Sequence, residues 1–565
     1  MAKVISIGNQ SFESIREKDN FYIDKTNFIR EWWDNDDTVT LITRPRRFGK
    51  TLNMSMLECF FSNKYKDRGD LFEGLEIWND EKYRKLQGTY PVIFLSFAEI
   101  KQNNYNDAVE KIKRIICEVC QQFDFLNNWD GLTEIEKKNI SNISYNMSDV
   151  MAQDLIKNMS NYLSRYYGKK VIILLDEYDT PMQEAYVNGY WEELVAFTRS
   201  LFNSTFKTNP YLERAIMTGI TRVSKESIFS DLNNLKVITV TSDEYSKCFG
   251  FTEDEVFAAL DEQGLSSEKE KVKLWYDGFT FGDEKDVYNP WSIINFLDEK
   301  KYKTYWADSS SNGLVNELIR TGSAEIKKTM ETLIAGGTVE KNIDEQIVFE
   351  QLKTNKDAVW SLLLASGYLR VETFRTEGRL NKKIYSLKLT NYEVEQMFGT
   401  MIERWFGGAD VPYNEFINAM LNGDIESMNE YMNRVTRGVI SYFDTGKTPS
   451  DEEPERFYHG LVLGLMVEQV DNYILNSNRE SGYGRYDIML EPIDKTNEKY
   501  PGIVIEFKVI NPRKENTLEE TVAAALKHIE EKNYDAELVK RGVKEENIHH
   551  YGFAFRGKEV LIDGR

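Results

Sequence analysis

The sequence is poor in cysteine. Its four cysteines, among 565 residues, are Cys59, Cys117, Cys120 and Cys248. So few cysteines exclude a disulfide framework and suit a reducing compartment. Cys117 and Cys120 form a CxxC inside a helical pattern, and the sequence has no second CxxC that would complete a zinc site. We therefore interpret both as ordinary helix residues.

Long apolar runs are absent as well. No run approaches the roughly 20 residues that a membrane span needs, and residues 1–20 lack the apolar core of a secretory signal. These absences predict a cytoplasmic protein without a membrane partner.

Positive charge is in deficit. Lys and Arg number 71 against 92 Asp and Glu, which gives a formal net charge of −21. This balance argues against a protein whose whole surface coats nucleic acid. It leaves room for a local basic channel, and one basic cluster stands out, formed by Arg44, Arg46, Arg47 and Lys50.

The length exceeds what one hydrophobic core usually supports, so we expect about two to four domains. In the first part of the chain, short apolar runs alternate with helical patterns. The runs lie at 39–43, 92–97, 171–175, 215–220 and 237–240. Such runs are typical of strands buried on both faces. They predict an α/β domain with a mainly parallel sheet over residues 1–245.

Strand patterns become sparse after this part. Thr252 and Glu255 form a capping box and Pro290 precedes another helical pattern, so we expect a mostly helical middle region over residues 246–449. A linker signal at 448–454 then precedes a C-terminal domain over 450–565. In that domain we expect strands at 486–490, 502–509 and 551–555 and a helix at 518–532.

The segment from Arg44 to Thr51, RPRRFGKT, follows the first predicted strand and precedes a helical pattern. This is the context of a P-loop, whose backbone N–H groups surround phosphates at a helix N-terminus. Gly49 would let the backbone approach, Lys50 would reach the β- and γ-phosphates, and Thr51 would ligate Mg²⁺. The general pattern has glycine where this chain has Arg44. The loop alone therefore fits a phosphate cradle and a basic surface turn equally well.

The apolar run 171–175 leads directly into Asp176 and Glu177. A carboxylate at the end of a buried strand can hold a Mg²⁺ water, and the next one can polarise the attacking water. The alternative is a strand that ends in surface acids, but the P-loop in the same domain favours nucleotide binding. The following strand ends near Thr218 and Arg222, which would sense the γ-phosphate or serve as turn residues. The predicted nucleotide-binding residues are Arg46, Arg47, Phe48, Gly49, Lys50, Thr51 and Asp176.

A second candidate site lies near the C-terminus. Glu506 and Lys508 are two residues apart in a predicted strand and so face one side, while Phe507 faces the other. Asp487, on the preceding strand, would share one or two Mg²⁺ ions with Glu506, and Lys508 would orient water or neutralise the phosphate. An E-x-K triplet by itself is common and also fits an exposed Glu–Lys pair.

The N-terminal half resembles the bacterial AAA-ATPase-like family that is commonly fused to a PD-(D/E)XK nuclease domain. The strings that carry the resemblance are FESIR at 12–16, YIDKT at 22–26, RPRRFGKT at 44–51 and LLDEYD at 174–179. Within that family the missing first glycine of the P-loop is the usual state. The resemblance implies ATP as the nucleotide.

The C-terminal part is similar to PD-(D/E)XK restriction-endonuclease-like domains. The resemblance assigns the family's active-site roles to Asp487, Glu506 and Lys508. Related sequences place a Gln on the following helix, where this chain has His528. His459 precedes another helical pattern and is a second histidine that could reach the site.

Together these features predict an α/β chain with a P-loop NTPase-like parallel sheet, a helical middle region and a restriction-endonuclease-like α/β domain. The leading hypothesis is an ATPase coupled to a Mg²⁺-dependent nuclease that acts on nucleic acid, with DNA favoured over RNA. One alternative is a regulatory NTPase switch whose nuclease-like domain only binds nucleic acid. Another is a nuclease whose ATPase-like half is an assembly module. The oligomeric state stays open.

The cofactors expected under the leading hypothesis are ATP and Mg²⁺. The predicted catalytic residues are Glu177, Asp487, Glu506 and Lys508, and the predicted metal ligands are Thr51, Asp176, Asp487 and Glu506.

Overall fold

The computed structural model describes residues 3–222, 228–229, 232–307, 315, 318–319, 324–334, 336–344, 358–378, 382–406, 414–439, 472–477, 480–481, 484–485, 487–497, 499–510, 515–556 and 559–565. The chain divides into two compact units. One is formed by Met1–Ser311 with Glu340–Glu393, and the other by Asn312–Val339 with Val394–Arg565. Within the described ranges, no helix is both long enough and apolar enough to cross a membrane.

The first unit is built on a five-stranded sheet in the order β2-β3-β4-β1-β5, with all neighbouring strands parallel. Its strands are β1 (Val39–Thr43), β2 (Val92–Ser96), β3 (Val171–Asp176), β4 (Leu212–Gly219) and β5 (Leu235–Ile238). They coincide, to within a few residues at the ends, with the five apolar runs of the sequence. The predicted α/β fold class is confirmed.

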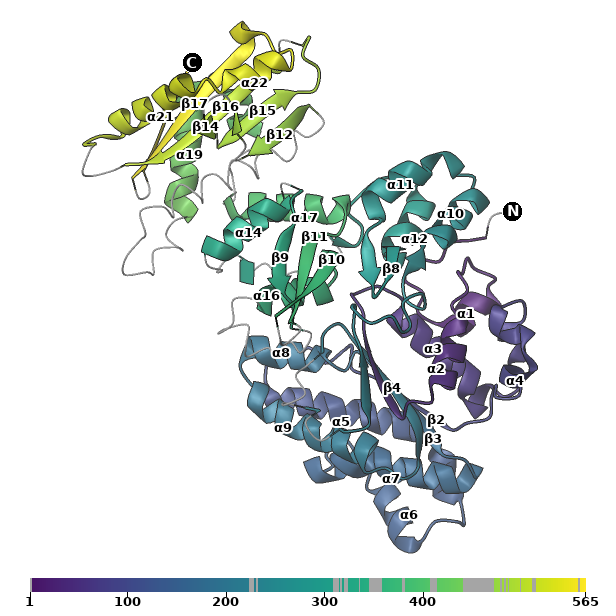
Figure 1. Ribbon diagram of the computed structural model, residues 1–565. Helices are drawn as coiled ribbons and strands as arrows, with labels where there is room; N and C mark the ends of the chain where they lie inside the picture. The colour runs from purple at the N-terminus through teal and green to yellow at the C-terminus, as the bar shows by residue number, and fades with distance from the viewer. Residues whose placement is uncertain are drawn as a thin grey trace. The chain divides into compact units, whose positions relative to one another are not determined.

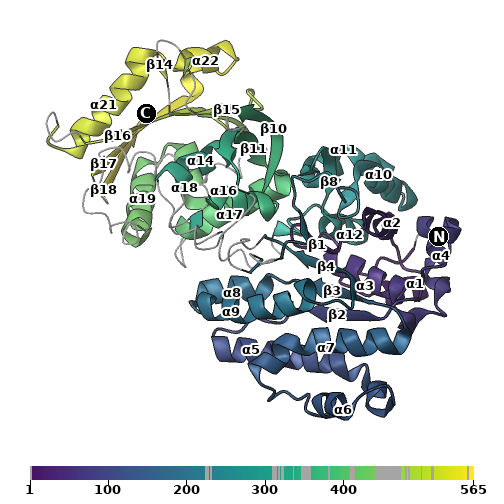
Figure 2. The ribbon, with the colours of Figure 1, turned by 60° about the horizontal axis from the view of Figure 1, so that its bottom comes forward.

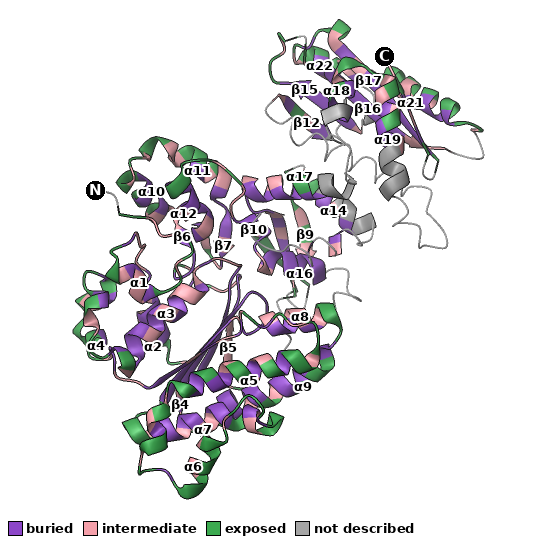
Figure 3. Cartoon of the chain, turned by 180° about the vertical axis from the view of Figure 1, so that it is seen from behind, coloured by how far each residue is buried: buried purple, intermediate pink, exposed green. Residues whose placement is uncertain are grey.

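Helices cover both faces of this sheet (Figures 1 and 2). On one face, α1 (Phe12–Glu17), α2 (Asn27–Asn35) and α3 (Lys50–Phe61) share an apolar core with the strands. On the other face lie α5 (Tyr105–Gln121), α7 (Asp149–Tyr167) and α9 (Trp191–Phe202). Further helices of this part are α4 (Glu81–Arg84), α6 (Glu134–Ser141) and α8 (Thr180–Asn188). In Figure 3 most of the sheet is buried, the edge strand β5 is mostly of intermediate exposure, and the outward helix faces are exposed. Strands β1 and β3 are buried along their whole length, and burial on both faces is why each of them is a continuous apolar run.

Helix α5 contains the CxxC. Cys117 and Cys120 are both buried in it and have free thiols. The interpretation of these cysteines as helix residues is confirmed.

A small antiparallel sheet follows in the first unit, in the order β6-β8-β7. Its strands are β6 (Phe251–Thr252), β7 (Phe279–Phe281) and β8 (Glu284–Tyr288), and its helices are α10 (Glu253–Glu262), α11 (Lys269–Tyr276) and α12 (Pro290–Glu299). The predicted capping box is present. The Thr252 N–H donates to Glu255 Oε2 at 2.7 Å, and the Glu255 N–H donates to Thr252 Oγ1 at 3.4 Å.

A second small sheet has the order β10-β11-β9. It consists of β9 (Val339–Asn342), β10 (Leu369–Glu377) and β11 (Lys382–Leu389), next to α16 (Ala358–Ala365). The middle region thus holds two sheets in addition to its helices. Their strands are short or carry charged residues on an exposed face, so they do not stand out as apolar runs in the sequence.

The second unit contains a mixed sheet in the order β12-β15-β16-β17-β18. Strands β16 and β17 run parallel, and the other neighbouring pairs are antiparallel. The strands are β12 (Tyr473–Ser477), β15 (Ile488–Pro492), β16 (Gly502–Val509), β17 (Ile548–Arg556) and β18 (Glu559–Gly564), and β13 (Glu480–Ser481) pairs with β14 (Gly484–Arg485). The helices are α14 (Ala324–Ile334), most of α17 (Tyr392–Phe406), α18 (Asn414–Asn422), α19 (Ile425–Val439), α21 (Leu518–Lys532) and α22 (Asp535–Lys540).

The two faces of this mixed sheet carry separate apolar cores. Ile503, Ile505 and Phe507 share one core with α18 and α19. Val504 lies in the other, with side chains of α21 and α22. Helices that precede residue 450, the predicted start of the C-terminal domain, therefore cover one face of its sheet. The predicted linker at 448–454 and His459 lie outside the described residues.

Candidate functional sites

The loop between β1 and α3 lies at the carboxyl edge of the parallel sheet. Gly49 has a φ of 77°, in the left-handed region that glycine adopts at little cost, and α3 begins at the next residue, Lys50. The Lys50 side chain is buried, and its Nζ donates to the carbonyl oxygens of Arg44 and Pro45 at 3.0 and 2.8 Å. Burial lowers the pKa of Lys50, an effect that the Glu177 carboxylate opposes. The loop thus places a lysine ammonium at a helix N-terminus, as phosphate binding requires.

Side chains from three neighbouring elements meet next to this loop. Thr51 Oγ1 donates to Asp176 Oδ2 at 2.7 Å, and the Thr218 hydroxyl donates to Asp176 Oδ1. Asp176 ends β3 and Thr218 lies on β4, the strand between β3 and β1. Burial raises the pKa of Asp176, while the two hydroxyl donors oppose the shift. The hydroxyl and carboxylate oxygens are hard ligands of the kind that Mg²⁺ prefers.

Two acidic residues after Asp176, Glu177 and Asp179, have different surroundings. Glu177 has a φ of 52°, which is uncommon for a residue other than glycine and marks local strain of the kind found at functional sites. Its carboxylate accepts a hydrogen bond from Thr180 Oγ1 at 3.0 Å. Asp179 is buried and accepts from the N–H groups of Ile220 and Thr221 at 3.0 and 2.8 Å. Asp179 therefore joins the ends of β3 and β4 and has a structural role that the sequence did not reveal.

Arg44 stands where the general P-loop has its first glycine. Its side chain is fully buried, and its guanidinium donates to the carbonyl oxygens of Thr43 and Thr239 at 3.0 and 2.7 Å. The guanidinium also lies 4.6 Å from the centre of the Phe281 ring. Arg44 therefore supports the loop from inside the protein. A basic surface turn, the alternative left open by the sequence, does not fit these contacts.

Arg46 and Arg47 attach the loop to the region around α12. The carbonyl oxygen of Arg46 accepts from Asn289 Nδ2 at 3.3 Å and from Trp306 Nε1 at 3.0 Å. The Arg47 guanidinium lies 3.8 Å from the centre of the Trp291 ring. These contacts hold the loop against residues of the middle region. Contact of Arg46 and Arg47 with a nucleotide stays a prediction.

Phe48 fixes the same loop through an aromatic cluster. Its ring is fully buried and lies 4.7 Å from the Phe279 ring and 5.3 Å from the Phe281 ring. A Cβ atom at Gly250 would approach the Phe48 ring to 3.0 Å, so the glycine makes room for the ring. With its side chain packed in protein, Phe48 has only its backbone N–H to offer a phosphate.

The second candidate site lies on the sheet of the second unit. Asp487 is predicted on a strand at 486–490. The observed strand β15 spans Ile488–Pro492, so Asp487 lies immediately before it; residue 486 lies outside the described part. Ile488 pairs with Ile505, the residue before Glu506, in the antiparallel ladder. Asp487 Oδ2 accepts the N–H of Phe507 at 2.8 Å, so its side chain binds a backbone group of β16 beyond the last ladder pair.

Glu506 and Lys508 lie on one side of β16, as the strand period predicts. Lys508 Nζ is 3.4 Å from Glu506 Oε1, and Glu506 is 5% exposed. Phe507 points the other way, into the core with α18 and α19. The E-x-K triplet is thus a buried carboxylate beside a lysine, and an exposed surface pair does not describe it.

Helix α21 adds His528 to this group. His528 Nδ1 is 2.6 Å from Glu506 Oε1. Burial and the charge of Lys508 lower the pKa of His528, which favours the neutral ring. An ionised Glu506 carboxylate only accepts hydrogen bonds, so the contact with it favours the tautomer that carries its proton on Nδ1. The helix that carries His528 has the predicted bounds.

Tyr534 is a neighbour of this site that the sequence did not single out. Its ring lies 5.8 Å from the His528 ring. Burial, Glu506 and Asp487 raise the pKa of Tyr534 to about 12. Asn533, the residue after α21, has a φ of 51° and turns the chain so that Tyr534 packs back on the sheet. A helix-terminating Asn followed by an aromatic residue is the signal that could have identified it.

The comparisons with known proteins agree with this two-site arrangement. Residues 6–229 match the family model of a predicted AAA-ATPase, and residues 453–564 match that of the PD-(D/E)XK nuclease superfamily. The chain therefore combines an N-terminal AAA-ATPase-like domain with a C-terminal PD-(D/E)XK nuclease superfamily domain, which confirms the resemblance. It is also similar to an uncharacterized protein in the vnfD 5′ region of Azotobacter chroococcum mcd 1, with 25% identity over 396 residues, 70% of this chain and 68% of the relative.

Proposed function

We propose that this protein is an ATPase coupled to a Mg²⁺-dependent nuclease that cleaves nucleic acid, DNA in preference to RNA, in the bacterial cytoplasm. The observation that carries the proposal is the position of Glu506. This buried carboxylate lies beside Lys508 and His528, with Asp487 next to it across the strand pair. A buried carboxylate among groups of opposite charge and hydrogen-bonding capacity is typical of a functional site.

Asp487 and Glu506 would hold the metal ion of the nuclease site, and a bound Mg²⁺ supplies an activated water and stabilisation of the leaving oxygen. Lys508 offers a positive charge to the phosphate beside this pair of carboxylates. His528 is a positioning residue, since its Nδ1–H fixes the orientation of the Glu506 carboxylate.

In the first unit, Lys50 would bind the β- and γ-phosphates of ATP, and Thr51 and Asp176 would hold its Mg²⁺. Thr218 fixes the Asp176 carboxylate through its hydroxyl. Glu177, whose charge acts on Lys50, would polarise the attacking water.

One observation favours a regulatory switch as the second candidate function. The P-loop contacts Asn289, Trp291 and Trp306 of the middle region through Arg46 and Arg47. A nucleotide that shifts the loop would shift these contacts as well. In this case ATP controls nucleic-acid binding, and the C-terminal site does not cut.

The deciding experiment incubates the full chain with Mg²⁺, ATP and a panel of single- and double-stranded DNA and RNA. We expect cleavage of DNA by the wild type and none by Lys508→Ala. Lys527→Ala, which removes an exposed lysine from α21, is the matched control and should cleave normally. Equal cleavage by wild type and Lys508→Ala would reject the nuclease assignment. Nucleotide-dependent binding without cleavage would favour the switch.

A further inference from the structure

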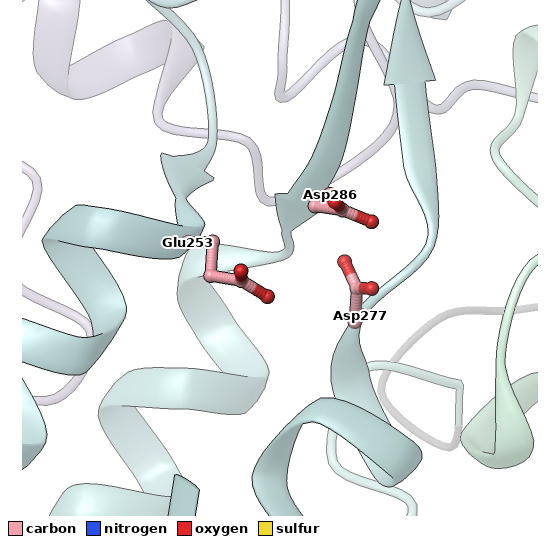
Figure 4. A group of neighbouring side chains, drawn as sticks. All are labelled: Glu253, Asp277 and Asp286. Atoms are coloured by element: carbon pink, nitrogen blue, oxygen red, sulfur yellow. The ribbon is translucent and has the colours of Figure 1, made fainter. Parts of the chain in front are cut away.

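A group of three carboxylates lies in the first unit beside the small sheet β6–β8. Glu253 begins α10, Asp277 follows α11 and Asp286 lies on β8. One carboxylate oxygen from each residue lies within 4.8 Å of those of the other two, and the side chains converge (Figure 4). None of the three belongs to the nucleotide or the nuclease site described above.

The spacing of these oxygens fits a single metal ion. Ca²⁺ binds oxygen ligands at about 2.3–2.6 Å, so two ligands of one ion lie at most about 5 Å apart. Carboxylates are the hard ligands that such an ion prefers. Tyr288 adds a further oxygen to the group, since its hydroxyl donates to Glu253 Oε2 at 3.3 Å.

Asp277 supplies an independent observation that points to a ligand. It is 9% exposed, and its Oδ1 is buried without a hydrogen-bond partner among the described residues. Its carboxylate points toward that of Asp286 (Figure 4). Burying a carboxylate oxygen without a hydrogen-bond donor raises the free energy of the folded state, and a bound cation would offset this penalty.

The charge balance of the group matches a divalent cation. Lys273 Nζ contacts Glu253 Oε2 and lies 3.9 Å from Asp286 Oδ2. When all four groups are ionised, three negative charges and one positive charge leave a net charge of −2.

We propose that Glu253, Asp277 and Asp286 bind one hard divalent cation of the Ca²⁺ type. The cation joins α10, the end of α11 and β8. Strand β8 leads directly to Asn289 and Trp291, which contact the P-loop. The site therefore stabilises the part of the middle region that holds the loop in place.

The test titrates Ca²⁺ by calorimetry into the full chain that carries Asp487→Asn and Glu506→Gln, without nucleotide, so that the nuclease site does not contribute. We expect one binding event, weakened at least about tenfold by Asp286→Asn because one charged ligand is lost. Asn suits the left-handed backbone of Asp286, whose φ is 56°. Asp283→Asn, an exposed acid on the same hairpin, is the control and should leave the affinity unchanged.

Two further measurements separate binding from a merely structural role. Lys273→Gln should tighten Ca²⁺ binding severalfold, because the ammonium competes with the ion for the carboxylates. At the same concentration, Ca²⁺ should raise the unfolding temperature of the chain with an intact cluster more than that of Asp286→Asn, because the stabilisation by a ligand grows with its affinity for the folded state. No binding heat at millimolar Ca²⁺, or equal affinities for Asp286→Asn and Asp283→Asn, would overturn the proposal.

Discussion

Single side chains at the ends of β1 and β3 carry the charges that ATP binding requires. Lys50→Ala removes the buried ammonium of the P-loop. ATP affinity should fall about tenfold to hundredfold, because hydrogen bonds to charged groups contribute about 1.5–3 kcal/mol. Calorimetric titration of ATP into the variant checks this. Lys85→Ala, which removes an exposed lysine, should bind ATP like the wild type. An unchanged affinity in Lys50→Ala would reject the P-loop assignment.

Glu177 separates ATP binding from ATP hydrolysis. Glu177→Gln keeps the size of the side chain and leaves Asp176 and Thr51 in place, so ATP affinity should be preserved. Hydrolysis should slow by about 100-fold or more, the usual effect of losing a general base. Release of phosphate by the variant is compared with that of Glu192→Gln, a change at an exposed acid on α9. Wild-type turnover in Glu177→Gln would give the base role to another residue.

The residues of the two sites differ in how far the sequence alone could place them. Glu506 and Lys508 could be placed side by side, because alternate residues of a strand face one side. The buried, supporting role of Arg44 could not be predicted from the sequence, because its hydrogen-bond partner Thr239 lies far along the chain. The position of Tyr534 near the site could not be predicted either, because it depends on how the chain turns after α21.

At the scale of secondary structure, the P-loop is held by an aromatic cluster as well as by hydrogen bonds. Phe48→Ala would leave a cavity among Phe279 and Phe281. It should destabilise the first unit by about 3–5 kcal/mol, the usual cost of truncating a buried Phe. Denaturant unfolding followed by tryptophan fluorescence measures the loss. Phe374→Ala, at a side chain that is 56% exposed, should change stability by less than about 0.5 kcal/mol. Equal effects would contradict the anchoring role.

The elements that the sequence predicted best are those with both faces buried. Strands β1 and β3 are buried along their whole length and therefore appear as apolar runs. The edge strand β5 contains Lys236, is mostly of intermediate exposure, and starts two residues before the predicted run at 237–240. Strands β10 and β11 have exposed charged residues and lack that signature. Helix α21 has the predicted bounds. The structure shows a Thr517 cap at its start, and this cap and the apolar spacing of the helix are local features.

At the scale of the whole molecule, the C-terminal domain depends on α18 and α19. Their side chains share a core with the mixed sheet. Asn429 and Asn433 of α19 also donate to the carbonyl oxygens of Ile562 and Val560 on the edge strand β18, at 2.6 and 2.7 Å. An unprotected edge strand and an uncovered apolar face both promote aggregation.

A fragment of residues 450–565 should therefore fail to fold, whereas a fragment of residues 394–565 should unfold cooperatively. Circular dichroism and thermal unfolding of both fragments test this. The interpretation fails if the shorter fragment is as stable as the longer one.

The central claim is that Asp487, Glu506 and Lys508 form a metal-dependent nuclease site. The most direct test titrates Mn²⁺ into Asp487→Asn, Glu506→Gln and Lys508→Ala, each in the Asp286→Asn chain without nucleotide, and assays DNA cleavage in parallel. Asp487→Asn and Glu506→Gln should lose metal affinity and cleavage together, because each removes a ligand. Lys508→Ala should bind Mn²⁺ normally and lose cleavage, because the lysine acts on water or phosphate. Cleavage by all three variants at the rate of the parent chain would contradict the claim.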